Sequence, residues 1–234
     1  MGLDVYVGPL TRYFSGDWKT VVQRWADESG TPLHVIRTQP ESQDAITDPE
    51  MIRPVILRWR GGLSAALEAN GNTLADWSEA ADTPYFTDKP DWGGWGGLIL
   101  WSVYAARNSK PPANADPRQY PDDVVYLEAV KDSRSTPFAQ IVLGPDYWLP
   151  GEFGVIGAPD PMGNNTTFGS VSRLNADLRL LNEQTWNATP QAMAEWHKDL
   201  EPGSIESEAR FGFSIMLKLA GLAQTNCLPM KLDY

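Results

Sequence analysis

The chain has 234 residues, which is long enough to bury a sizeable hydrophobic core in one large domain or two small ones. Its composition, 42% hydrophobic and 21% charged, is typical of a globular protein. Thirty acidic against nineteen basic residues give a formal net charge of −11, and so acidic a surface makes nucleic acid and membranes poor partners and a basic protein a good one.

Nothing in the sequence predicts secretion or membrane insertion. Cys227 is the only cysteine, so a disulfide within the chain is impossible and a reducing compartment fits. The opening "MGLDVYVG" lacks the basic region of a signal peptide. The longest apolar run, residues 95–106, is too short and too rich in glycine to span a bilayer. We therefore expect the protein in the cytoplasm.

The first forty residues predict a strand, a helix and a second strand. Residues 3–7 alternate in polarity, as a half-buried strand does. A helix follows, capped by Ser15 or Asp17 and ended by Gly30. The short apolar stretch 32–38 predicts the second strand, and this order of elements is typical of α/β and α+β folds.

The motif "TDPE" at 47–50 predicts the start of the next helix. Thr47 is the expected cap, and Glu50 stands three residues later, where it completes a capping box. Pro54 and the glycine pair at 61–62 interrupt the helical pattern. The sequence therefore predicts two short helices here instead of one.

The stretch "DWGGWGGLILW" at 91–101 is the most unusual in the chain, and it has two interpretations. Glycines near a helix start allow close backbone contact, and the apolar residues that follow predict a buried helix over 96–108. Alternatively, Trp92 or Trp95 lines a groove for a ligand. Because the apolar residues cover wide helical faces, core packing is the favoured interpretation.

The second half of the chain begins with a loop that holds four prolines between 111 and 121 and marks a possible subdomain boundary. Two β-like stretches follow at 124–130 and 138–144, and both are predicted as strands. Two further runs within 153–170 flank a cluster of turn residues, which predicts a β-hairpin.

The remaining residues predict three helices and a closing strand. The first helix begins after the cap Ser170, and the second begins after the cap Thr189. The third helix covers 204–226, and the strand covers 228–234. Together the elements predict a single compact α+β domain over 1–234, with a mixed or antiparallel sheet and several helices packed against it.

Catalytic and metal-binding motifs are missing from the sequence. The two histidines, His34 and His197, have no recognisable catalytic neighbourhood, and no G-x-S-x-G or metal-ligand spacing is present. We therefore predict no catalytic residue, no cofactor and no metal. The alternative is a hydrolase-like enzyme for a small or sugar-like substrate, which would use Asp or Glu with either histidine in a cleft lined by Trp92 and Trp95.

Clusters of acidic residues with nearby aromatic residues indicate a function more clearly than any catalytic or metal-binding pattern in the sequence. Carboxylates often gather in solvated loops and at helix N-termini, and an acidic surface also serves solubility alone. The functional interpretation is an anionic face that attracts a basic partner and holds it by aromatic anchors. The predicted partner-binding residues are Asp76, Glu79, Asp82, Tyr85, Asp88, Asp91, Trp92, Tyr120, Asp122, Asp123 and Tyr126.

Four segments carry a resemblance to a known group of proteins. The opening "MGLDVYVGPLTRYFSGDW", the middle "YWLPGEFG", the downstream "FGSVSRL" and the ending "LPMKLDY" together resemble a family of uncharacterised bacterial cytosolic proteins. Small acidic cytosolic proteins of this type are often immunity proteins. The resemblance implies a non-catalytic, immunity-type inhibitor of a cationic toxin, and it supplies no site residues.

Overall fold

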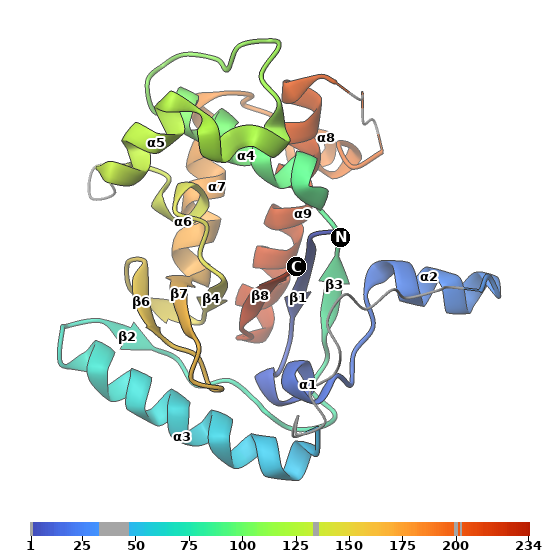
Figure 1. The fold of residues 1–234 in the computed structure, drawn as a ribbon, viewed down its shortest axis with the longest axis vertical. Coiled ribbons are helices and arrows are strands. Elements are labelled where there is room, and N and C mark those ends of the chain that lie inside the picture. The colour runs from blue at the N-terminus through green and yellow to red at the C-terminus, as the bar shows by residue number, and fades with distance from the viewer. Residues whose placement is uncertain (1, 33–46, 133–135, 199–200, 202) are drawn as a thin grey trace.

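A six-stranded sheet with helices on both faces organises the fold (Figure 1). The computed structural model describes residues 2–32, 47–132, 136–198, 201 and 203–234. The helices are α1 (Leu10–Ser15), α2 (Val21–Ser29), α3 (Pro49–Glu68), α4 (Asp91–Ala105), the 3-10 helix η1 (Pro117–Asp122), α5 (Val124–Lys131), α6 (Ala139–Val142), α7 (Val171–Gln184), α8 (Pro190–Glu195) and α9 (Ile205–Asn226). The strands are β1 (Asp4–Val7), β2 (Thr73–Leu74), β3 (Phe86–Asp88), β4 (Tyr147–Leu149), β5 (Gly151–Glu152), β6 (Ile156–Pro159), β7 (Asn165–Ser170) and β8 (Met230–Asp233).

The sheet is mixed. Its strand order is β3-β1-β8-β4-β7-β6, and β4 and β7 run parallel while the other neighbours run antiparallel. Strands β2 and β5 form a separate two-stranded sheet. The predicted α+β class with a mixed sheet is therefore confirmed.

The two faces of the sheet bury different cores. Val5 and Val7 of β1 and Leu232 of β8 join one core with residues of α4, α7 and α9. Tyr147 and Leu149 of β4 belong to a second core with residues of α1 and α3. Because side chains alternate along a strand, β4 contributes to both cores, with Trp148 in the first and Tyr147 and Leu149 in the second.

The contact between α4 and α9 depends on small residues. A Cβ on Gly97 would lie 2.9 Å from the backbone nitrogen of Ala209, and a Cβ on Gly212 would lie 2.1 Å from the carbonyl oxygen of Gly94. No side chain fits between backbones this close. The buried-helix interpretation of the Trp-Gly segment is therefore confirmed, although α4 begins at Asp91, five residues before the predicted start.

Several predicted elements are confirmed. Strands β1 and β8 form at the two ends of the printed sequence, and β6 and β7 form the predicted hairpin. Ser170 caps α7 and Thr189 caps α8 through their side chains. The predicted long helix is α9, whose cap is Ser204.

The prediction of two short helices around Pro54 is wrong, because α3 continues through both interruptions. Its cap is Asp48 instead of Thr47. Ile52, Ile56 and Leu63 lie on one face and are buried in the second core. Burial of this continuous face stabilises the helix despite the proline and the glycine pair, since tertiary packing outweighs local propensity.

The predicted strands at 124–130 and 138–144 are also wrong, because these stretches form α5 and α6. Asp123 caps α5, and its Oδ1 accepts hydrogen bonds from the backbone N–H groups of Val125 and Tyr126. Val125 and Tyr126 pack against the first core. The valine-rich composition favoured a strand, but the cap and inward-facing side chains stabilise a helix.

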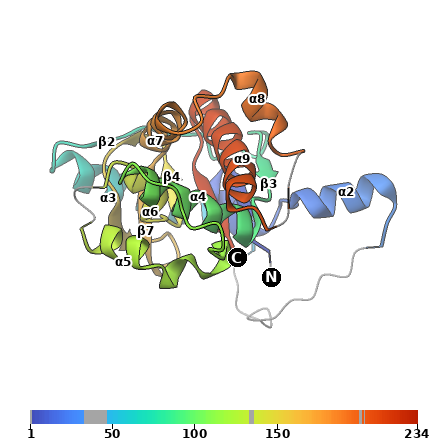
Figure 2. The same cartoon turned by 90° about the horizontal axis from the view of Figure 1, so that it is seen from above.

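Helix α2 projects from the body of the fold (Figures 1 and 2). Its cap is Thr20, which forms a capping box with Gln23, so the predicted caps Ser15 and Asp17 are wrong. Thr20 is the better cap because the side-chain oxygen of Gln23, three residues later, accepts a hydrogen bond from the backbone N–H of Thr20. The predicted strand at 32–38 lies almost entirely outside the described residues.

We predict that Gly212→Ala destabilises the protein by about 3 kcal/mol, because the added methyl group forces α4 and α9 apart. Urea unfolding followed by tryptophan fluorescence measures this change. Gly221→Ala on the same helix is the matched control, since a Cβ there meets nothing within 4 Å. It should stabilise the protein by up to about 1 kcal/mol through helix propensity. Equal effects of the two substitutions would contradict the close-contact explanation.

A second prediction concerns Asp177 of α7, whose carboxylate accepts a hydrogen bond from the backbone N–H of Gln140. Burial raises the pKa of Asp177 to about 6. The folded state therefore holds this proton more tightly than the unfolded state, and stability falls as the pH rises from about 4 to 6. Asp177→Asn should remove this dependence and stabilise the protein at pH 7 by about 1 kcal/mol, a value discounted for partial exposure.

Urea unfolding of this variant at a series of pH values provides the test. The matched control is Glu183→Gln, an exposed position on the same helix. It should change the free energy of unfolding by less than about 0.5 kcal/mol. A pH profile of Asp177→Asn that parallels the unsubstituted protein would contradict the assignment.

Candidate functional site

The fold distributes the eleven predicted partner-binding residues over three regions. The first region surrounds the start of α1, the second lies where β3 meets α9, and the third joins α4 to η1 and α5. The first region holds Asp76, Glu79, Asp82 and Tyr85, and the second holds Asp88. The third region holds Asp91, Trp92, Tyr120, Asp122, Asp123 and Tyr126.

In the first region Glu79 is buried, with 6% of its surface exposed. Its carboxylate accepts hydrogen bonds from the backbone N–H groups of Leu10 and Thr11 and from the indole N–H of Trp77, at 3.2, 2.7 and 2.6 Å. Glu79 therefore stabilises the start of α1, and its carboxylate does not face a partner.

The other members of this region are more accessible. Asp82 is exposed, and the exposed Asp76 carboxylate lies 3.2 Å from the guanidinium of Arg60. Tyr85 is half-buried and stacks on Tyr6, with ring centroids 6.0 Å apart. This region is separated in the fold from the aromatic residues of the third region.

In the second region the Asp88 carboxylate receives a hydrogen bond from the Lys218 ammonium at 2.9 Å. This pair borders a cavity that His197 also lines. The cavity brings one histidine and one carboxylate together, and Lys218 already neutralises that carboxylate. Trp92 and Trp95 do not line this cavity, so the cavity differs from the cleft expected of the enzyme alternative. The other histidine, His34, lies outside the described residues.

The third region assembles four aromatic side chains from separate segments. The rings of Trp92 on α4 and Tyr234 after β8 meet edge to face, with centroids 5.7 Å apart. Tyr120 of η1 and Tyr126 of α5 meet in the same way at 5.1 Å. A Cβ on Gly96 would lie 2.9 Å from the ring of Tyr120, so Tyr120 packs against α4 one turn after Trp92, and the two pairs occupy neighbouring turns of this helix. A single aromatic surface therefore forms from four elements.

Carboxylates border this aromatic surface. Asp146 accepts a hydrogen bond from the Tyr234 hydroxyl at 2.8 Å, and Asp91 adjoins Trp92 on α4. We name the set Asp91, Trp92, Tyr120, Tyr126, Asp146 and Tyr234 the aromatic–acidic patch. Of the remaining predicted residues, Asp122 is exposed at the end of η1, and Asp123 caps α5.

The Asp146 carboxylate holds its negative charge firmly. Partial burial opposes ionisation, but hydrogen bonds from Thr166, Thr167 and Tyr234 outweigh it and lower the pKa of Asp146. For Tyr234, burial and the hydrogen bond to Asp146 raise the pKa to about 12. The pair is therefore a neutral phenol donating to a charged carboxylate, which fixes the ring of Tyr234.

Two lysines next to the patch are already engaged, whereas Arg118, which lines a groove together with Asp91, is exposed. The Lys89 ammonium lies 3.6 Å from an oxygen of Asp91 and 3.9 Å from one of Asp4. Lys231 is enclosed between the rings of Tyr13 and Tyr147, 4.8 and 4.9 Å from their centroids, and burial lowers its pKa. Neither ammonium is free to repel a cationic partner at this surface.

Sequence reasoning found Asp91, Trp92, Tyr120 and Tyr126 but missed Asp146 and Tyr234. The ending "LPMKLDY" gives no signal for Tyr234, since its alternation would place residue 234 on the same sheet face as the buried Met230 and Leu232. Asp146 in "GPDYW" has no signal either, because its contacts depend on the pairing of β4 with β7.

Searches of protein-family models, of curated proteins and of solved structures find no match to this chain. The resemblance of the four segments to a bacterial cytosolic family therefore stays a prediction. Within the described ranges, no three histidine, cysteine or acidic side chains gather closely enough to hold a metal ion. Nor does any helix of those ranges have the length and hydrophobicity needed to cross a bilayer.

We predict that Glu79→Gln destabilises the protein by about 1 to 3 kcal/mol, because the amide nitrogen cannot accept the buried hydrogen bonds that a carboxylate oxygen accepts. Chemical denaturation provides the measurement. Asp82→Asn, an exposed change in the same segment, should stay within about 0.5 kcal/mol of the unsubstituted protein. A Glu79 variant as stable as this control would show that the carboxylate is not structural.

Proposed function

We propose that this protein is a non-catalytic binding protein that holds a basic protein partner on its aromatic–acidic patch. The observation that carries the proposal is the convergence of four aromatic side chains with two carboxylates from separate parts of the chain. Tyrosine and tryptophan are enriched among residues that dominate binding energy at protein interfaces. Carboxylates beside them match the arginine and lysine side chains of a basic surface.

The anchors are held in place before a partner arrives. Tyr234 is 65% exposed, yet its hydroxyl is hydrogen-bonded to Asp146 and its ring contacts Trp92. Tyr120 and Tyr126 are half-buried and pack against the first core. Because these rings lose little conformational freedom on binding, the entropic cost of forming a complex is reduced.

Charge supports the same function. The chain carries a formal net charge of −11, which attracts a cationic protein over distances of about a Debye length and speeds encounter. Around the patch, carboxylates outnumber basic groups. The carboxylates belong to Asp4, Asp91, Asp146 and Asp233, and the basic groups belong to Lys89, Arg118 and Lys231. Association should therefore weaken as salt concentration rises.

The partner we infer is a cationic toxin, with this protein acting in the cytoplasm as its immunity-type inhibitor. The bound protein would cover the toxin's basic surface, so inhibition would come from steric occlusion together with charge complementarity. Such a role needs no catalytic residue and no cofactor. It agrees with the resemblance of the four sequence segments to small acidic bacterial proteins.

We predict that the double variant Asp91→Lys/Trp92→Ala loses this activity. The test expresses products of neighbouring genes in a laboratory bacterium and measures growth with and without this protein. At least one product should stop growth, and the unsubstituted protein should restore it. Removal of one anchor and reversal of one charge should weaken binding by about a hundredfold or more, and rescue should fail.

The control is Glu28→Lys/Trp25→Ala on α2, where both residues are exposed. It makes the same change in charge and removes the same kind of ring, far from the patch, so it should rescue growth fully. If no product of a neighbouring gene is both toxic and bound by this protein, the proposed function is refuted. Equal rescue by the two double variants would refute the assignment of the patch.

A further inference from the structure

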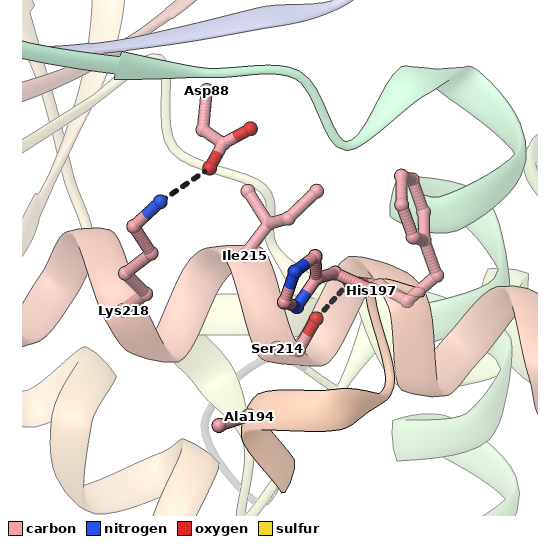
Figure 3. Close-up of a pocket in the computed structure, with 7 residues that line it drawn as sticks. Asp88, Ala194, His197, Ser214, Ile215 and Lys218 are labelled. Carbon is pink, nitrogen blue, oxygen red and sulfur yellow. Dashed lines mark hydrogen bonds and ion pairs between the residues drawn. The ribbon is translucent and has the colours of Figure 1, made fainter. Parts of the chain in front are cut away.

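A cavity of about 330 Å³ lies between α8 and α9 (Figure 3). Ser214 and Ile215 of α9 form its floor, and both are buried. Ala194 of α8 and His197 just after it line another side, and Figure 3 shows the imidazole turned toward Ser214 and Ile215. This α8–α9 cavity is separate from the aromatic–acidic patch, since the two share no residue.

The walls of the cavity suit a flat apolar molecule. Phe211 and His197 present two rings, and Ile215 and Ala194 add aliphatic surface. Rings of this kind stack on an aromatic guest. A volume near the lower end of the range for small-molecule pockets limits the guest to one or two fused rings.

A few polar atoms fix the orientation of the guest. Within the described part of the chain, the ring of His197 makes no hydrogen bond. The Ser214 hydroxyl donates to the carbonyl oxygen of Phe211 at 2.9 Å, which leaves its oxygen free to accept. One hydrogen-bond donor on the guest therefore finds an acceptor at either residue.

The charges at the rim favour a neutral guest. Asp88 and Lys218 pair at 2.9 Å, so these two residues add no net charge to the cavity. A cationic guest would have to leave water for apolar walls without a free carboxylate. An anionic guest would meet the same walls and the net negative charge of the whole chain.

We propose that the α8–α9 cavity binds a compact, neutral aromatic molecule that carries one hydrogen-bond donor. The proposal does not depend on the function assigned to the aromatic–acidic patch. Indole has the required size, charge and single N–H donor, and it serves as the probe.

The test titrates the full chain with indole and follows the histidine ring protons by NMR. The chain has only two histidines, so His197→Gln assigns their signals directly. The His197 signal should shift and saturate as indole is added. Indole-3-acetate and tryptamine, which carry a negative and a positive charge, should each bind at least about tenfold more weakly than indole.

Two matched variants connect the binding to the cavity. Ala194→Trp places a large side chain into the cavity from an exposed position on α8 and should weaken indole binding at least about tenfold. Ala192→Trp, exposed on the same helix and outside the cavity, should leave binding within about twofold. A His197 shift that does not saturate at millimolar indole, equal binding by the two variants, or tighter binding of a charged analogue would each overturn the proposal.

Discussion

The close approach of α4 and α9 is the contact on which the rest of the structure depends. Glycines on both helices bring their backbones together, so a Cβ on Gly94 or Gly212 would overlap the opposite backbone. Neighbouring glycines of α4 serve other contacts. A Cβ on Gly93 would lie 1.9 Å from the Glu208 carboxylate, and one on Gly96 would lie 1.8 Å from the carbonyl oxygen of Pro117. The glycines of α4 therefore allow both α9 and η1 to pack closely against this helix. This arrangement places Trp92 beside Tyr234 and Tyr120 beside α4, and it fixes α9 as the floor of the α8–α9 cavity.

Local signals were sufficient to predict the elements whose stability is local or strongly patterned. The Ser170 cap, the β6–β7 hairpin and the dense apolar residues of α9 each have a short-range cause, and the structure shows all three. The predictions failed where tertiary packing decides. Pro54 breaks an isolated helix, yet α3 keeps its buried face on the second core. The valines of α5 favour a strand by propensity, whereas the Asp123 cap and the adjacent core favour a helix.

The candidate site could likewise be predicted only in part. Trp92, Tyr120 and Tyr126 could be proposed because aromatic residues stand near acids in the sequence, but nothing local shows that they converge. Their convergence depends on the packing of η1 against α4 and on the strand pairing that brings β8 beside β1 and β4. Tyr234 and Asp146 are 88 residues apart, and their hydrogen bond exists only once β8 and β4 pair. For Glu79 the prediction failed in the other direction. This acid in a polar segment was predicted to face a partner, but contacts with α1, 69 residues away in the chain, bury it.

The burial of Glu79 also shows why net charge alone identifies no binding site in this protein. Many of its carboxylates serve the fold itself: Asp48, Asp116 and Asp123 cap helices. Asp160 accepts hydrogen bonds from the backbone of the β6–β7 turn. Such acids satisfy N–H groups that would otherwise lack partners, so their number reflects helix starts and turns as much as partner recognition. The aromatic–acidic patch differs from them because its carboxylates adjoin exposed or half-buried rings from four elements while nearby ammonium groups are paired or enclosed. It is this combination of fixed rings with locally unbalanced negative charge, and not acidity in general, that makes the patch suited to a basic protein surface.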